Sequence, residues 1–112
     1  MIIRSAILEG RVAEENRADF DNHMATTVLD AIARYPSIRE VRLRRPVESE
    51  PGAPPIYMVF DLRFDSLTDM HAALASPIRQ QVRASISEVM QSFDGRVYHL
   101  VLEEIATKDA SS

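Results

Sequence analysis

The chain has 112 residues, a length typical of one domain, and its 46% hydrophobic and 27% charged residues give an ordinary globular balance. It contains no cysteine, which excludes disulfides, thiolate metal sites and cysteine nucleophiles. The formal net charge of −4 disfavours nucleic-acid binding, and no apolar segment has the length of a signal peptide or a membrane span, so we expect a cytoplasmic protein with no membrane partner.

The first half of the chain predicts a strand, a helix and a second strand. Residues 2–8 are rich in isoleucine, as short strands are. A helix is expected to start at Asn16, which with Asp19 has the spacing of a capping box, and to end at Pro36. Its apolar positions recur at helical spacing and form one face. They are Phe20, Met24, Val28, Ala31 and Tyr35. Residues 41–47 alternate apolar and charged side chains, which indicates a strand.

The second half predicts a strand, two helical pieces and a last strand. A loop with four prolines and a glycine leads to residues 56–64, whose strict alternation makes them the clearest strand of the chain. A second capping box, Ser66 with Asp69, opens a helix, and the serine–proline pair at residues 76–77 opens the next. A turn at residues 94–95 is expected to lead into the final strand.

The order of elements is therefore βαββαβ, the ferredoxin-like arrangement of an α+β domain. Two helices are expected on one face of a four-stranded antiparallel sheet, with the odd-numbered residues from Tyr57 to Arg63 on the other face. That bare face carries apolar groups and needs a partner, for which a two-fold homodimer is the simplest solution. We expect one domain over residues 1–105 and a polar tail over residues 106–112.

Two stretches of the sequence resemble the EthD family of the dimeric α/β-barrel superfamily. One runs from Phe20 through "YPSI", and the more specific one is "YMVFDLRFDSLTDMHAALASP"; the resemblance covers residues 2–105. It implies a ferredoxin-like protomer that closes a barrel with a second copy and holds a small-molecule cavity between sheet and helices. The superfamily includes cofactor-independent monooxygenases, muconolactone isomerases, polyketide cyclases and heme enzymes, so the resemblance implies no single reaction.

The chain departs from the family pattern on the first helix. Family members often carry a histidine there, eight residues after the phenylalanine, and this position is Val28 in the chain. His23 lies five residues earlier, so it is not the family's histidine. The resemblance therefore implies no chemistry that depends on that group.

Five polar residues are candidates for lining a ligand pocket. They are His23, Tyr57, Asp61, His71 and His99. His23 lies at the edge of the apolar helix face, where a boundary histidine is favoured over a general base. His71 is expected to be a packed helical side chain, and His99 could reach the same interior as Asp61 or Arg63. For Asp61 and Arg63, pairing with each other or across a dimer interface is favoured over ligand binding.

Other chemistries find little support in the sequence. The three histidines lack the i, i+4 pairing of zinc and iron sites, so we expect no metal, heme or other cofactor. An RNA-recognition domain has the same βαββαβ order, but its third strand needs glycines and stacking aromatics that residues 56–64 do not supply. The arginine-rich residues 39–45 are interpreted as a solvated edge strand rather than as a carboxylate-binding site.

Three hypotheses on function remain open. A dimeric barrel could bind a small apolar or ring-containing metabolite and convert it by proton transfer without a cofactor. A protein of the same fold could instead be a non-enzymatic carrier or accessory protein. In the third hypothesis the dimer is tightly packed and its cavity is residual, which a well-formed cavity with convergent polar groups would exclude.

Overall fold

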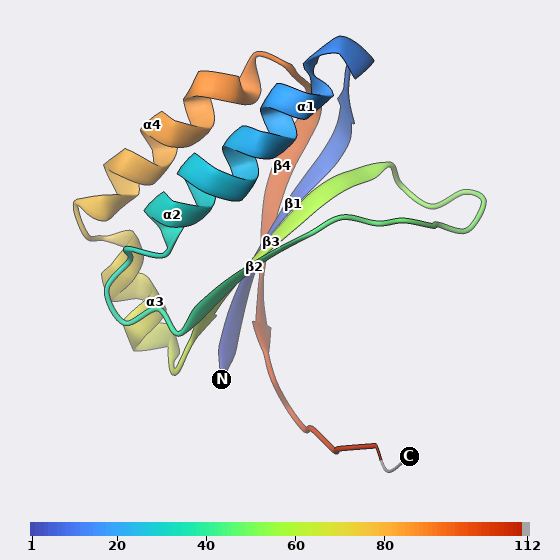
Figure 1. The fold of residues 1–112 in the computed structure, drawn as a ribbon. Coiled ribbons are helices and arrows are strands. Elements are labelled where there is room, and N and C mark those ends of the chain that lie inside the picture. The colour runs from blue at the N-terminus through green and yellow to red at the C-terminus, as the bar shows by residue number, and fades with distance from the viewer. Residues whose placement is uncertain (111–112) are drawn as a thin grey trace.

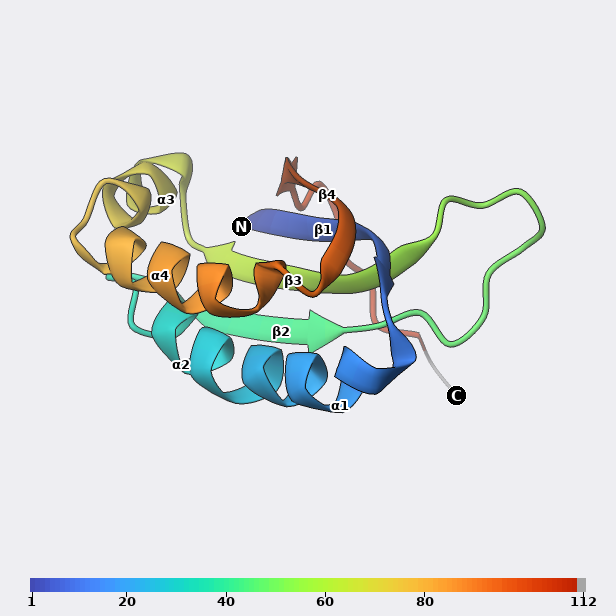
Figure 2. The same cartoon turned by 90° about the horizontal axis from the view of Figure 1, so that it is seen from above.

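The computed structural model describes residues 1–110 and confirms the predicted βαββαβ order. The elements are β1 (Ile2–Val12), α1 (Glu14–His23), the π-helical turn η1 (Met24–Val28), α2 (Leu29–Ile32), β2 (Glu40–Arg44), β3 (Ile56–Phe64), α3 (Leu67–Leu74), α4 (Ile78–Met90) and β4 (Phe93–Glu103). The strands form one antiparallel sheet in the order β2-β3-β1-β4. Both views show α1–α2 and α4 side by side on one face of the sheet, with α3 at its end (Figures 1 and 2). Among these helices none is long and apolar enough to cross a membrane.

The first helical segment begins two residues earlier than the sequence predicts. Its N-cap is Ala13, and no side chain of residues 1–110 caps it. Asn16 and Asp19 lie inside the helix, so the capping box predicted from them is wrong. Halfway along, the segment widens into the single π-helical turn η1 before it continues as α2.

The core lies between this helical layer and the sheet. All five residues of the predicted helix face, Phe20 to Tyr35, are buried, as are the even-numbered residues of β3 from Met58 to Phe64. Burial of each large apolar side chain contributes about 1.5–3 kcal/mol. Periodic apolar spacing thus predicts this core correctly on both the helix and the strand.

One residue of β3 breaks the predicted alternation. The register between β1 and β3 shifts at a bulge, where Tyr57 is passed over by the pairing. A bulge re-aims side chains, and the Tyr57 ring lies on the helix side, with its centroid 5.5 Å from that of Phe20 and 6.3 Å from that of Phe93. The prediction that Tyr57 shares the open face with Asp61 is therefore wrong.

The predicted turn at residues 94–95 is also wrong, because both residues belong to β4. Gly95 lies directly opposite Gly10 of β1, and a Cβ atom on Gly95 would stand 2.1 Å from the carbonyl oxygen of Glu9. A Cβ on Gly10 would stand 2.2 Å from the carbonyl oxygen of Asp94. The two backbones come this close only because both residues are glycine.

The two later helix starts differ from each other. The Ser66 hydroxyl accepts a hydrogen bond of 3.1 Å from the backbone N–H of Asp69, so this predicted cap is confirmed. Ser76 does not cap α4; its hydroxyl donates to the carbonyl oxygen of Ala73 (2.6 Å), and Pro77 is the N-cap residue.

The open face of the sheet is divided lengthwise into a charged half and an apolar half. The charged half lies on β2 and β3 and consists of Glu40, Arg42, Arg44, Asp61 and Arg63. The apolar half lies mainly on β1 and β4 and consists of Ile3, Ile7, Val59, Tyr98, Leu100 and Leu102. Leu100 and Leu102 are 47% and 45% exposed, so part of this apolar surface faces solvent in the single chain.

Two segments lie outside the layered structure. Residues 45–55 form the loop between β2 and β3, which projects away from the sheet (Figure 2). Residues 104–110 follow β4 without helix or strand, and the last two residues of the predicted tail, Ser111 and Ser112, lie outside the described residues.

Candidate functional site

A cavity of about 240 Å³ lies between α4, the first helical segment and the β1–β4 side of the sheet. Most of its wall is apolar, with side chains from strands below and helices above. These include Leu8, Met24, Phe60, Val82, Ile86 and Val97. The volume is slightly below the usual range for drug-sized ligands, which suits a molecule of one or two rings.

Five polar side chains complete the wall. They are Arg4, Tyr35, Arg79, Arg83 and His99. Arg4 and His99 are diagonal neighbours on the helix-facing side of β1 and β4, because Arg4 pairs with Val101 and Ala6 pairs with His99. Arg79 and Arg83 lie one turn apart on α4, which forms the wall opposite the sheet. Arg79 and His99 thus come from opposite walls of the cavity. Residues far apart in the chain are thus brought to one cavity.

The three cavity arginines lack carboxylate partners, as do Arg11, Arg17 and Arg34 elsewhere in residues 1–110. Within residues 1–110, no carboxylate forms an ion pair with Arg4, Arg79 or Arg83. The described lining of the cavity also contains no aspartate or glutamate. By contrast, Arg39 and Arg96 pair with nearby carboxylates on the surface. The cavity therefore carries positive charge that the described part of the chain does not neutralise.

Burial and this charge set the protonation of the neighbouring groups. Burial lowers the pKa of His99, and the charges of Arg4 and Arg79 lower it further. Burial raises the pKa of Tyr35, and this effect outweighs the opposing charges of the nearby arginines. Burial, followed by the Arg79 charge, lowers the pKa of Arg4, which still remains a cation at neutral pH. At pH 7 His99 is therefore a neutral imidazole that can accept a proton, and Tyr35 keeps its hydroxyl proton and can donate a hydrogen bond.

Of the five residues that the sequence nominates, His99 alone lines this described cavity. His71 is exposed on α3, outside the cavity wall. Asp61 lies on the open face of the sheet, so it does not share an interior with His99, contrary to expectation. Within residues 1–110, no group of three His, Cys, Asp or Glu side chains is arranged to hold a metal ion.

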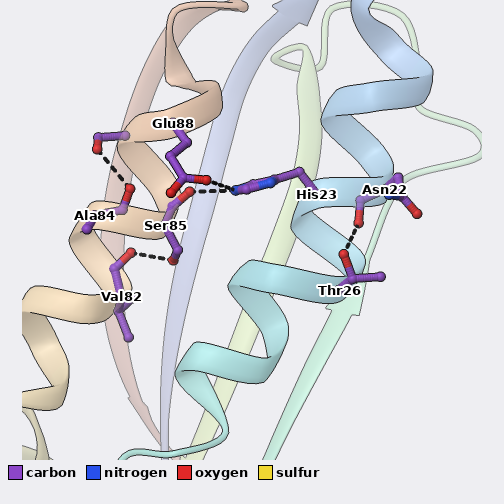
Figure 3. Close-up of polar contacts among 8 residues, drawn as sticks. Asn22, His23, Thr26, Val82, Ala84, Ser85 and Glu88 are labelled. Carbon is purple, nitrogen blue, oxygen red and sulfur yellow. Dashed lines mark hydrogen bonds and ion pairs between the residues drawn. The ribbon is translucent and has the colours of Figure 1, made fainter.

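His23 joins two helices instead of facing the cavity. Its Nε2 atom lies 2.7 Å from the carbonyl oxygen of Ser85 and 3.5 Å from Oε2 of Glu88, both on α4 (Figure 3). A carbonyl oxygen only accepts, so Nε2 carries the hydrogen and donates it. This contact is of the kind expected for a boundary histidine.

Asp61 and Arg63 each pair with other residues rather than with one another. Asp61 accepts a hydrogen bond of 2.5 Å from the Ser5 hydroxyl and forms an ion pair with Arg44. Arg63 lies 3.8 Å from Oε1 of Glu40. The arginine-rich strand β2 thus does hold a carboxylate, but that carboxylate belongs to the protein itself.

Tyr57 is held by an aspartate of α1. Its hydroxyl donates a hydrogen bond of 2.6 Å to Asp21 Oδ1, and Asp21 Oδ2 accepts from Arg45 at 3.1 Å. Burial, together with the hydrogen bond and charge of Asp21, raises the pKa of Tyr57 to about 12. Tyr57 therefore links the start of β3 to α1, and its hydroxyl is too weak an acid to transfer its proton to a ligand near pH 7.

Of the five polar residues of the cavity wall, the sequence does not nominate four: Arg4, Tyr35, Arg79 and Arg83. A local signal existed for one of them, because Arg4 shares the helix-facing side of its strand with Ile2 and Leu8. A cation on an otherwise apolar strand face calls for an explanation. For Arg79 and Arg83, helical spacing alone gives no indication that α4 turns them toward β1.

No protein-family model and no curated protein matches the sequence. Among solved structures, an EthD family protein from Bacillus halodurans is similar with a TM-score of 0.71 and 19% identity, covering 94% of this chain and all of that one. A dimeric protein of ferredoxin-like fold from Bacteroides fragilis has a TM-score of 0.67 and 15% identity over 92% and 95% of the two chains. SnoaB, a cofactor-independent oxygenase from Streptomyces nogalater, has a TM-score of 0.63 and 16% identity over 95% and 94%.

The chain has the ferredoxin-like fold of these proteins. The predicted fold class and the likeness to an EthD family protein are therefore confirmed in structure. At these identities the likeness establishes the architecture alone, and the chemistry of the cavity has to be argued from its own residues.

Proposed function

We propose that this protein binds a small, largely apolar molecule in the cavity between α4 and the sheet. The observation that carries the proposal is an apolar cavity of about 240 Å³ in which polar groups from β1, α4 and β4 converge. Such a combination is the usual form of a small-molecule site. It favours binding over the hypothesis of a residual cavity in a tightly packed dimer.

We further propose that the bound molecule undergoes proton transfer without a cofactor. His99 is neutral at pH 7, and its imidazole can take a proton from an acidic C–H or O–H group of the ligand. The electron pair stays on the ligand as an enolate or a similar anion, which the charges of Arg4 and Arg79 stabilise. One protein of similar structure, SnoaB, is described as a cofactor-independent oxygenase, so this fold is compatible with catalysis that uses no cofactor.

A hydrogen-exchange experiment tests the proton transfer. 2-Tetralone, a bicyclic ketone with acidic α-hydrogens, is incubated with the protein in D₂O, and loss of the α-hydrogen signal is followed by NMR. We expect exchange above the buffer rate with the unaltered protein and at the buffer rate with His99→Gln. His71→Gln is the matched control, because His71 is exposed on α3. Binding of 2-tetralone without accelerated exchange would support the carrier alternative and refute catalysis.

The third part of the proposal is a homodimer formed through the open face of the sheet. The apolar half of that face exposes Leu100 and Leu102, and burial of apolar surface is the main driving force of association. The comparison structure from Bacteroides fragilis is described as dimeric. Native mass spectrometry is expected to give the dimer mass, and the double change Leu100→Asp with Leu102→Asp the monomer mass. The control is Val47→Asp, since Val47 is 93% exposed in the β2–β3 loop. A monomer for the unaltered protein would refute this part.

A further inference from the structure

We infer that the cavity selects an anion: a molecule of one or two rings that carries a carboxylate, bound by the guanidinium groups of Arg4, Arg79 and Arg83. This inference rests on the proposed small-molecule function and names the class of ligand. The apolar wall fits the rings, and the three cations fit the acidic group. A purely apolar ligand would leave the arginines without a partner, and a small inorganic anion would leave the apolar wall without a contact.

The first argument is charge balance. Three arginines line the same described cavity, no acidic side chain does, and their guanidinium groups form no ion pair within residues 1–110. Arg79 lies close enough to Arg4 for its charge to lower the pKa of Arg4. Arg4 and Arg79 are partly buried and Arg83 is exposed. Like charges gathered in one cavity raise the free energy of the folded protein unless an opposite charge approaches them. The ligand is the group that would supply this charge.

The second argument is geometry. Arg4 comes from the sheet, while Arg79 and Arg83 come from α4 on the opposite wall, so an anion between them is approached from two sides. A planar guanidinium matches a planar carboxylate through two parallel N–H···O bonds. Tyr35 adds a hydroxyl at the same place, since all three arginines act on its pKa. The site thus offers several hydrogen-bond donors and, in its described lining, no carboxylate.

A matched pair of ligands tests the inference on the unaltered protein. 2-Naphthoate and 2-naphthamide share the ring system and differ in charge. The chain has no tryptophan, so naphthalene fluorescence can be followed directly during a titration. We expect 2-naphthoate to bind at least roughly tenfold more tightly, the equivalent of one charge-assisted hydrogen bond. Equal affinities would refute the inference and leave the proposed function intact, whereas binding of neither compound would refute the proposed function.

Three variants then locate the selectivity. Arg79→Gln and Arg83→Gln are expected to lower the affinity for 2-naphthoate about tenfold each and to leave that for 2-naphthamide unchanged. Arg34→Gln is the control, because it removes the same charge from an exposed residue outside the cavity wall. If Arg34→Gln weakens 2-naphthoate as much as the cavity variants do, the general field of the protein is responsible and the assigned site is refuted.

Discussion

The Ser5 hydroxyl donates a hydrogen bond of 2.5 Å to Asp61 across β1 and β3, at the centre of the open face of the sheet. Both residues are buried, although the helices cover only the opposite face. Arg44, from β2, forms an ion pair with the second carboxylate oxygen of Asp61. A carboxylate in such a place is tolerated because both of its oxygens have partners.

The first prediction concerns this pair. Ser5→Ala and Asp61→Ala, made singly and together, are expected to show a coupling energy of about 1–3 kcal/mol, as hydrogen bonds to charged groups do. The free energy of unfolding is measured with urea at one fixed protein concentration. Ser87→Ala is the control, because its exposed hydroxyl donates only within α4. Additive effects of the two changes would show that the hydrogen bond does not stabilise the sheet.

The second prediction concerns the close approach of β1 and β4. Gly95→Ala is expected to lower the free energy of unfolding by about 1–3 kcal/mol or to prevent folding, because its Cβ would collide with the carbonyl oxygen of Glu9. Gly52→Ala is the comparison, since Gly52 also has a positive φ but nothing lies within 4 Å of the added atom. Equal losses for both variants would show that φ alone matters, and not the contact between strands.

The third prediction separates His23 from ligand binding. His23→Ala removes the hydrogen bond to the Ser85 carbonyl between α1 and α4, so we expect a loss of about 1–2 kcal/mol in the free energy of unfolding. The affinity for 2-naphthoate is expected to stay unchanged, because His23 is not part of the cavity wall. Weaker binding with unaltered stability would instead give His23 a role in the pocket.

The fourth prediction is a pH dependence set by His99. Its pKa is lowered in the folded protein, so between that value and the unfolded value of about 6.5 the unfolded chain binds more protons. Stability is therefore expected to fall as the pH drops below about 6.5, and His99→Gln is expected to remove this part of the loss. Binding of 2-naphthoate should raise the pKa of His99, which NMR of the imidazole hydrogens reports. A pKa that does not respond would place the anion elsewhere.

The fifth prediction concerns Tyr57. Asp21→Asn removes the charge that helps to hold the pKa of Tyr57 at about 12, so this pKa is expected to fall toward 10 without reaching it, since burial remains. The change is measured from the absorbance of tyrosinate during an alkaline pH titration, and Tyr57→Phe identifies which part of the titration belongs to Tyr57. An unchanged titration would show that burial alone determines the pKa.

The parts of the fold that follow from local pattern were predictable, and those that depend on pairing between distant strands were not. The periodic spacing of Phe20 to Tyr35 gives the buried helix face directly, and the alternation of β3 gives its core residues. The position of Tyr57 depends on a bulge against β1, which lies some fifty residues away in the chain. Sequence alone therefore assigned this side chain to the wrong face.

Dependence on contacts between distant segments also explains why most polar residues of the candidate site are not predictable from the sequence. His99 is predictable as a candidate, because a histidine on an otherwise apolar strand face is an uncommon group that titrates near neutral pH. Arg4 and Arg79 meet only after β1 pairs with β4 and α4 packs across them, and neither event has a local signature in the sequence. Arginines are mostly exposed in folded proteins, so the sequence does not distinguish the few that face a cavity.

The π-helical turn η1 constrains the chain in its length as well as in its residue types. Buried residues of this segment follow one another four apart, from Phe20 to Ile32, and in a uniform α-helix such a row drifts by about 40° at each step. The wider turn of η1 offsets part of this drift, so that both ends of the segment reach the same core. Residues 25–27 of this turn are exposed. Deletion of one of them would leave seven residue steps between Phe20 and Val28, close to two turns of a uniform α-helix, so Phe20 would stay against Tyr57 while the turn loses its extra width. Insertion of one further residue would instead rotate Phe20 by about 100° and carry it away from Tyr57.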